Sequence, residues 1–348
     1  MHERTPTVHS PADESAWLAA LDSSNEALAF HTPNWIASIC ESDRYTNATR
    51  LYDFGDGRRL ILPLVRRRTA PRSIATAASL PYGWGFGGPV GPGTVRPEEA
   101  ALVLADLGRG STLRTSVRPN PLAAAPSQLP DGVHVIPIQR SAHVLELGGD
   151  FDHVERRFSS SARRDLRRAE QSSLRVEADS SGRLVSVFYE LYVKSAERWT
   201  RGRRLPALAR ARLLRRDPPR KFEVVARRMG EACRIWVASV DDRPAAAIIV
   251  LTQGVNASYW RGAMDRELAG PTRANFLLHS RAIEEACRNG RRYYHMGETD
   301  PGSSLARFKA HFGAEVHPYV EYRLEHLRAA DARRRLSRAR ALLGRSKA

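Results

Sequence analysis

The sequence predicts an α/β protein with two tandem domains, each built around a mixed central sheet. The chain has 348 residues, and a single hydrophobic core stops growing near about 250 residues. Apolar residues make up 42% of the chain, which is ordinary for a globular protein. Segments with strand periodicity alternate with segments of helical periodicity, and this alternation is typical of α/β folds.

The first half of the chain contains one clear hairpin. Two strands, Thr49–Phe54 and Arg59–Arg67, are joined by the turn Gly55-Asp56-Gly57. The other expected elements are helices at Asp13–Leu21, Pro33–Cys40 and Pro97–Leu107, a glycine- and aromatic-rich loop at Leu80–Gly93, and strands at Ser111–Val117 and His143–Leu147. Gly148-Gly149 marks a boundary, so we expect domains at 1–147 and 148–325, followed by a basic tail at 326–348.

The second half begins with a helix over Asp150–Glu170, in which apolar residues recur every three or four positions. Thr272 is a candidate N-cap of a later helix that ends near Gly290. The remaining expected elements are helices at Arg183–Trp199 and Ser304–Phe312 and strands at Ala232–Val240, Pro244–Thr252, Asn256–Ala263, Arg291–Gly297 and His317–Glu325. From Ala232 onward the order is β-β-β-α-β-α-β, the core of the GCN5-related N-acetyltransferase (GNAT) fold.

The formal net charge is +17, with 55 basic and 38 acidic residues. Such an excess favours a polyanionic partner such as nucleic acid. Only four basic residues are lysines, namely Lys194, Lys221, Lys309 and Lys347. This skew indicates a genomic preference for arginine, but that preference does not explain the excess over acids.

The composition also bears on the cellular location of the protein and on whether it holds disulfides or a metal. The first residues lack the apolar stretch of a signal peptide, and no run of about 18–20 apolar residues is present, so we expect a cytoplasmic protein. Cys40, Cys233 and Cys287 are too scattered for a disulfide framework or a metal site. We expect small buried side chains there, no metal and no bound cofactor.

Several motifs resemble the Fem-type transferases, the FemA/FemB/FemX group. They are HTPNW (31–35), the helix at 159–177, SYWRGA (258–263), NFLLH (275–279), AIEEA (282–286), GRRYYHMG (290–297) and LARFKAHFGAEV (305–316). The resemblance covers residues 30–325, and its sharpest piece is RFKAHFG (307–313). It implies two tandem GNAT-like domains and the transfer of an amino acid from aminoacyl-tRNA to an amine, most often on a peptidoglycan precursor.

The resemblance places a functional Phe-Lys pair at Phe308 and Lys309. Aminoacyl transfer passes through a tetrahedral oxyanion, which requires positive charge or hydrogen-bond donors. The Lys309 ammonium could stabilise that oxyanion or bind a phosphate, and it could also be an exposed helical lysine. Phe312 lies four residues after Phe308 on the same helical face and is expected in the core. Phe308 is either core or a wall against the adenosine end.

Six further residues are candidates for binding substrate. Strand alternation places Tyr259 and Arg261 on one face and Trp260 on the other, and one face is expected to line the cleft. Asn275 could bind substrate or the helix backbone, and Glu298 could act at the end of its strand or cap the next helix. Trp84 could approach a sugar or peptide acceptor, or belong to an ordinary loop.

Arginines at helical spacing predict a phosphate-binding surface. Arg163 with Arg167, and Arg164 with Arg168, are four residues apart, a spacing that suits phosphates. Together with Arg203 and Arg204 they could form a track for tRNA or a diphosphate, and the alternative is a solvated face.

No general base for tRNA-dependent transfer is evident in the sequence. Two other functions remain as alternatives to that transfer. An acyl-CoA N-acyltransferase would need a glycine-rich loop before the main helix, but Asp265–Asn275 has one glycine followed by proline. The motif RRMGEA (Arg227–Ala232) fits formally, but it precedes a strand. The third reading is a non-catalytic binding protein on the same fold. We expect a monomer, with aminoacyl-tRNA as donor, or acetyl-CoA or another acyl-CoA under the second reading.

Overall fold

The computed structural model describes residues 5–68 and 75–325, and the described residues group into two compact units. The first unit contains 5–26, 43–140 and 318–325, and the second contains 27–42 and 141–317. The predicted division at 147/148 therefore differs by three segments, because 27–42 and 141–147 group with the second unit and 318–325 with the first. The basic tail predicted at 326–348 lies outside the described residues.

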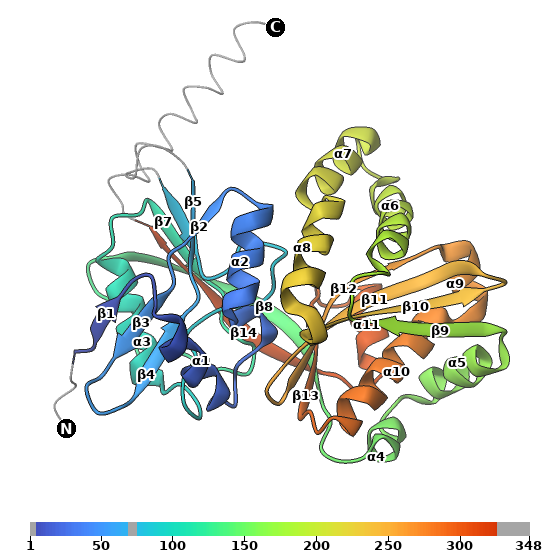
Figure 1. Cartoon of the computed structure of the whole chain (residues 1–348), viewed down its shortest axis with the longest axis horizontal. Helices are drawn as coiled ribbons and strands as arrows, with labels where there is room; N and C mark the ends of the chain where they lie inside the picture. The colour runs from blue at the N-terminus through green and yellow to red at the C-terminus, as the bar shows by residue number, and fades with distance from the viewer. Residues whose placement is uncertain (1–4, 69–74, 326–348) are drawn as a thin grey trace, which may run out of the picture. The chain divides into compact units, whose positions relative to one another are not determined.

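The first unit is an α/β unit with two sheets (Figure 1). One has the order β1-β3-β4 and the other β2-β5-β6-β7-β14. The strands are β1 (Thr7–His9), β2 (Tyr45–Asn47), β3 (Arg50–Asp53), β4 (Arg59–Leu62), β5 (Val65–Arg67), β6 (Thr76–Ala78), β7 (Arg114–Val117) and β14 (Glu315–Glu325), with helices α1 (Glu14–Asp22) and α3 (Pro97–Gly108). Strands β6 and β7 pair in parallel, and the isolated bridges Ser24–Gly93 and Gly87–Pro119 of this unit are parallel as well.

One predicted strand of the first unit is wrong in its extent. Arg59–Arg67 is divided between β4 and β5, which join different sheets. Pro63 lies at the division, and proline has no amide hydrogen to donate to a neighbouring strand. The break therefore follows from a residue inside the predicted strand.

The second unit has the strand order β8-β13-β12-β11-β10-β9, in which β8 contributes residues 141–146. The strands are β8 (His134–Glu146), β9 (Leu174–Asp179), β10 (Cys233–Val240), β11 (Arg243–Gln253), β12 (Asn256–Met264) and β13 (Tyr293–Glu298). The helices are α2 (Pro33–Ser42), α4 (Phe151–Arg156), α5 (Ser160–Gln171), α6 (Val185–Thr200), α7 (Pro206–Arg216), α8 (Pro219–Met229), α9 (Arg266–Thr272), α10 (Ala274–Arg288) and α11 (Ser304–Ala310), with 3-10 turns η1 (Ala29–His31) and η3 (Gly230–Ala232). In this unit α5 and α10 cover one face of the sheet, and α6 and α8 cover the other (Figure 1).

Helix caps and backbone conformation explain why some helices of the second unit begin and end at other residues than predicted. The predicted helix Asp150–Glu170 is two helices, because the Ser159 side chain accepts from the Ala162 amide and caps α5. The predicted N-cap Thr272 is instead the last residue of α9, and α10 begins after Arg273, which adopts a left-handed conformation with φ 58°. Asp241 and Asp242 form the tight turn between β10 and β11, with positive φ at both residues.

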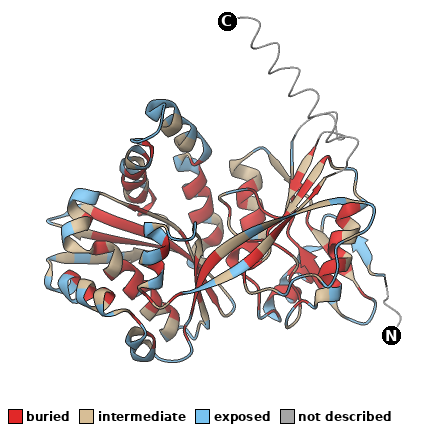
Figure 2. Cartoon of the chain, turned by 180° about the vertical axis from the view of Figure 1, so that it is seen from behind, coloured by how far each residue is buried: buried red, intermediate tan, exposed pale blue. Residues whose placement is uncertain are grey.

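Buried residues lie along the strands and on the inward faces of the helices (Figure 2). In the second unit the core contains strand residues such as Ile248 and Tyr294 together with Leu278, Ile283 and Phe312 from the helices. Within residues 5–68 and 75–325, no helix is long and apolar enough to cross a membrane.

Candidate functional site

Strands β12 and β13 separate shortly after they begin to pair. They pair in parallel only between Asn256–Ser258 and Tyr293–His295, while β12 continues to Met264 and β13 to Glu298. Beyond the pairing, backbone N–H and C=O groups on the facing edges do not bond to the other strand. Such groups can hydrogen-bond a ligand that lies between the strands. We call this opening the strand split.

The corresponding parallel pair of the first unit is closed by its own chain. The loop that follows β6 pairs back onto the end of β7: the Ser79 amide donates to Ser116 O at 2.8 Å, and the Gly87 amide donates to Arg118 O at 2.6 Å. A Cβ on Gly88 would lie 2.8 Å from Pro119 Cα, so this close approach requires glycine. Among the described residues, the open parallel pair is therefore the one in the second unit.

Lys309 lies at the strand split. Its Nζ donates to the backbone oxygens of Gly297 at 2.8 Å and Glu298 at 3.0 Å, both on β13. A Cβ on Gly297 would be 4.0 Å from Lys309 Nζ and 4.0 Å from Tyr259 O on β12. The side chain is only 2% exposed, so it is not an exposed helical lysine. Two of the three ammonium hydrogens therefore bond the carbonyl oxygens of Gly297 and Glu298. The third can donate to a substrate atom.

The environment of Lys309 changes its protonation. Burial lowers the pKa of Lys309 to about 7, against the opposing effect of the Glu298 carboxylate. His143 on β8 is buried beside it, and burial followed by the Lys309 charge lowers the pKa of His143. The His143 Nδ1 lies 2.8 Å from Thr299 Oγ1. The site thus contains one lysine that changes charge near neutrality and a histidine held in the neutral form.

Aromatic rings form the wall of the split next to α10. The rings of Tyr259 and His279 are 4.7 Å apart, and those of His279 and Phe308 are 5.4 Å apart. Burial lowers the pKa of His279 to about 3, with the Lys309 charge as a second cause. Phe312 is 1% exposed and belongs to the core, as predicted, whereas Phe308 is half-buried and packs on Phe312. Phe308 therefore supports the core with one side of its ring and keeps part of it accessible.

The predicted alternation of Tyr259, Trp260 and Arg261 is wrong, because β12 contains a β-bulge. Ile249 pairs with Arg261 and Val250 with Tyr259, so Trp260 is the extra residue. Tyr259 packs on α10, whereas Trp260 packs on α8 through Phe222 at 5.5 Å. The Arg261 guanidinium lies 5.1 Å from the centre of the Trp260 ring. Trp260 and Arg261 therefore share the α8 side, and Tyr259 alone faces the split's aromatic wall.

A buried carboxylate organises the α8 side of the unit. Asp217 is fully buried and accepts hydrogen bonds from Lys221 Nζ at 2.7 Å and the Tyr192 hydroxyl at 2.8 Å. Arg216 also donates to it at 3.0 Å, and Arg261 Nη2 is 3.8 Å away. Burial would raise the pKa of Asp217, but the charges of Lys221 and Arg261 outweigh burial and hold it well below its usual range. We call these residues the Asp217 network.

The three other residues predicted to bind substrate are Asn275, Glu298 and Trp84, and they do not lie together. The Asn275 Nδ2 is 2.8 Å from Met264 Sδ, at the point where β12 ends. Glu298 lies on β13 at the split, and the cap of α11 is Ser303, so the capping alternative for Glu298 is wrong. Trp84 belongs to the first unit, where its indole is buried and donates to Asp43 Oδ2 at 3.2 Å. The structure thus brings Asn275 and Glu298 close to β12 and β13, and gives Trp84 a packing role.

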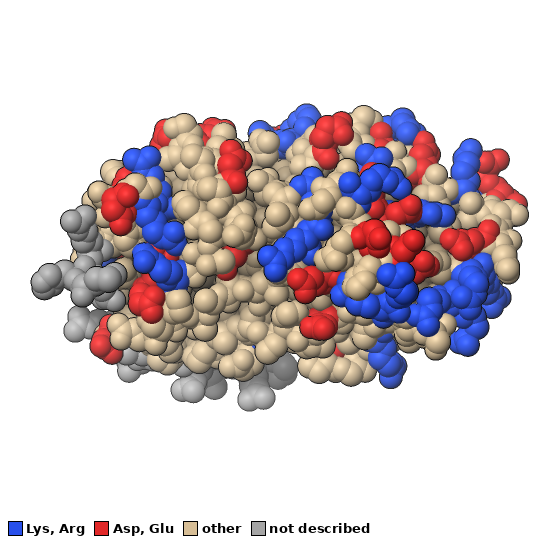
Figure 3. Space-filling model, turned by 90° about the horizontal axis from the view of Figure 1, so that it is seen from below, with Lys and Arg blue, Asp and Glu red and all other residues tan. Residues whose placement is uncertain are grey.

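The predicted arginine track is divided. Arg163 donates to the backbone oxygens of Arg156 and Phe158, so it does not form the expected fork with Arg167. Arg164, Arg167 and Arg168 are exposed on α5, whereas Arg203 and Arg204 are exposed between α6 and α7, on the opposite face of the sheet. On the face shown in Figure 3, basic side chains gather over α4 and α5 among acidic ones. The two groups of arginines are two separate surfaces.

Several residues of the site carry no signal in the sequence. His143 and His279 stand within apolar stretches, where a histidine is indistinguishable from a core residue. Asp217 and Lys221 lie in a basic segment that resembles a solvated surface. Lysine is so rare in this chain that its use could have pointed to Lys221, because Lys221 and Lys309 are both buried.

A comparison with known proteins supports the acyltransferase interpretation. The family model described as an acetyltransferase (GNAT) domain matches residues 156–310, a range that includes Lys309. The match falls in the part of the chain where the GNAT-like fold was predicted. No curated protein sequence matches the chain.

The described part of the chain has a fold similar to that of FemX. That crystal structure has a TM-score of 0.63 at 11% identity, with 91% of this chain and 96% of FemX covered. A conserved protein of unknown function from Bacteroides thetaiotaomicron has a TM-score of 0.53 at 10% identity and covers 91% of this chain and 99% of its own. The predicted resemblance to Fem-type proteins of the GNAT superfamily is confirmed at the level of the fold.

Proposed function

We propose that this protein transfers an aminoacyl group from aminoacyl-tRNA to an amine and forms an amide or peptide bond. The observation that carries the proposal is the buried Lys309 ammonium at the strand split, with one N–H left for a substrate oxygen. The FemX fold supports the donor class, because the Fem-type resemblance implies aminoacyl-tRNA.

The reaction places specific demands on Lys309. The amine nitrogen attacks the carbonyl carbon of the aminoacyl ester, a C–N bond forms, and negative charge develops on the carbonyl oxygen. The C–O bond to the tRNA ribose then breaks, and the proton lost by the amine is taken up by the ribose oxygen. A fixed donor at the developing oxyanion accelerates such a reaction because it needs no reorganisation. Lys309 is held by the carbonyl oxygens of Gly297 and Glu298 for this role.

The segment between β12 and α10 supports a donor other than acyl-CoA. It folds as α9, with Pro271 inside the helix and Arg273 in the left-handed conformation. Arg273 Nε lies 3.1 Å from Asp165 Oδ1. A pyrophosphate loop needs several consecutive amides that point at the ligand, and a short helix with an internal proline is a poor source of them. The alternative motif Arg227–Ala232 covers the end of α8 and η3, before β10.

A second candidate is an acyl-CoA-dependent N-acyltransferase, which the match to the acetyltransferase (GNAT) model favours. The same oxyanion donor would serve a thioester. The acceptor in either case is an amine-bearing small molecule or a peptidyl nucleotide, such as a peptidoglycan precursor or a secondary-metabolite intermediate.

The donor is tested by supplying purified protein with charged tRNA or acyl-CoA and a set of candidate amines. We expect deacylated tRNA and an amide product, with amide formation abolished when the tRNA is hydrolysed beforehand. Release of free CoA without any dependence on tRNA would establish the second candidate and exclude the first.

We expect tRNA binding to depend steeply on salt, since each arginine that neutralises a phosphate releases counterions. Changing Arg164, Arg167 and Arg168 to glutamine should lower the slope of log K against log salt by about one for each phosphate that is no longer neutralised. The double change of Arg203 and Arg204 tests the opposite face in the same way. Arg183→Gln is the control, since Arg183 pairs with Glu177 at 2.7 Å. An affinity for tRNA that does not change with salt concentration would show that neither arginine surface binds tRNA.

A further inference from the structure

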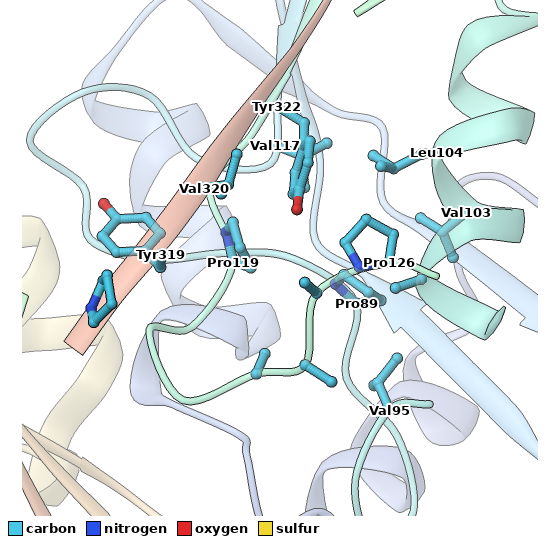
Figure 4. Close-up of a pocket in the computed structure, with 15 residues that line it drawn as sticks. Pro89, Val95, Val103, Leu104, Val117, Pro119, Pro126, Tyr319, Val320 and Tyr322 are labelled. Carbon is cyan, nitrogen blue, oxygen red and sulfur yellow. The ribbon is translucent and has the colours of Figure 1, made fainter. Parts of the chain in front are cut away.

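The first unit contains an apolar cavity that the proposed transfer reaction does not use. It lies between β7, β14, α3 and the loop that follows β7 (Figure 4). Its volume is about 130 Å³. Valines, alanines, prolines and a leucine make up most of its lining, together with two tyrosines. Its place in the first unit separates it from the strand split of the second.

The lining is built so that the cavity stays open. Pro89, Pro119, Pro126 and Pro318 contribute rings without flexible side chains, and the alanines of the loop carry a single methyl group. Such residues cannot rotate into the space as leucine or methionine would. An apolar cavity of about 150 Å³ in another protein stays dry and binds benzene. A space of this size and polarity therefore suits a six-carbon ring or a short aliphatic chain.

The outer wall of the cavity is anchored at both ends. Asn120 is 3% exposed; its Nδ2 donates to Glu26 O at 2.9 Å, and its Oδ1 accepts from the Leu122 amide at 3.0 Å. At the other end of the wall the Ser127 amide donates to Pro97 O at 3.0 Å. Two fixed ends hold the loop away from the sheet, and a preformed site loses less free energy on binding than a mobile one.

Among the side chains labelled in Figure 4, one polar group enters the cavity. The Tyr322 side chain comes from β14, and its hydroxyl points into the space beside Pro119 and Pro126 (Figure 4). Burial raises the pKa of Tyr322, so the hydroxyl remains protonated at neutral pH. Within the described residues it makes no hydrogen bond to protein. It can therefore donate to one polar atom of a bound molecule.

We propose that this cavity is a binding site for a small apolar molecule or group, a single aromatic ring or a chain of similar volume, that carries one hydrogen-bonding atom. The apolar lining takes the hydrocarbon part, and the Tyr322 hydroxyl bonds the polar atom. The parallel strand pair of the first unit is closed and offers no place for a substrate. The cavity would instead give this unit a separate ligand-binding site.

Phenol and toluene are suitable probes, with binding measured by isothermal calorimetry and by the rise in melting temperature of the full chain. We expect both to bind the unmodified protein in the millimolar range or tighter. Ala100→Leu adds three carbons to the lining and should abolish binding of both probes. Ala105→Leu makes the same change on α3 outside the cavity and should leave binding unchanged. The melting temperatures without probe establish that both variants fold.

Tyr322→Phe separates the two parts of the proposal. We expect this variant to bind toluene as the unmodified protein does and to bind phenol several-fold more weakly. Failure of both probes to bind the unmodified protein, or equal binding by Ala100→Leu, would overturn the site. Equal phenol binding by Tyr322→Phe would overturn the role of the hydroxyl. None of these outcomes depends on aminoacyl transfer.

Discussion

Replacing Lys309 with methionine lowers the turnover of the transfer reaction by about 100-fold or more, which is the typical loss when one donor to an oxyanion is removed. Methionine fills a similar space without charge, and the variant should fold because burial already disfavours the ammonium at this position. Lys309→Ala should lose at least as much. The measurement is a single-turnover rate with saturating donor and acceptor. Lys194→Met is the control, because Lys194 is exposed and pairs with Asp265.

The pH dependence of the same pair of proteins distinguishes two roles for Lys309. Its pKa of about 7 means that the ammonium is present below pH 7 and is lost as the pH rises through that value. A donor to the oxyanion must be charged, so the ratio of the unmodified rate to the Lys309→Met rate should fall as the pH rises through 7. The ratio cancels the ionisation of the acceptor amine. A ratio that rises instead would assign Lys309 as a proton acceptor, and equal rates at every pH would place it outside the chemistry.

Asp217→Asn destabilises the protein by about 3–5 kcal/mol, the usual cost of removing one partner from a buried ion pair. The change takes the carboxylate away from Lys221 and from the Tyr192 hydroxyl, and both are buried. The free energy of unfolding in urea measures the effect. Asp242→Asn is the matched control, since Asp242 is 88% exposed and pairs with Arg175 on the surface, where such pairs contribute about 0–1 kcal/mol.

The effect of Asp217→Asn should shrink at low pH. The folded pKa of Asp217 is depressed, so its contribution is fully present above the unfolded pKa of about 4 and declines as the pH falls below it. Unfolding free energies that match the unmodified protein at pH 7 would show that the Asp217 network does not stabilise the second unit.

The sequence predicted the class of fold and the position of Lys309, because both depend on local pattern. Hydrophobic periodicity identified β10, β11 and β12, and the RFKAHFG motif drew attention to Lys309. The faces of Tyr259, Trp260 and Arg261 were not predictable, since a bulge depends on how β11 and β12 pair. His279 was missed for a related reason: its ring contacts Tyr259, Tyr294 and Phe308, which are distant in sequence.

The exchange of segments between the two units determines when each can finish folding during synthesis. The core of the first unit includes Tyr322 and Leu324 of β14, which are synthesised after every residue of the second unit. The second unit in turn uses Trp35, made early, which packs against Trp260 at 5.1 Å. The first unit therefore cannot complete its core before β14 is made, and the second incorporates helix α2, which was made long before. Each unit is therefore encoded by discontinuous stretches of the gene.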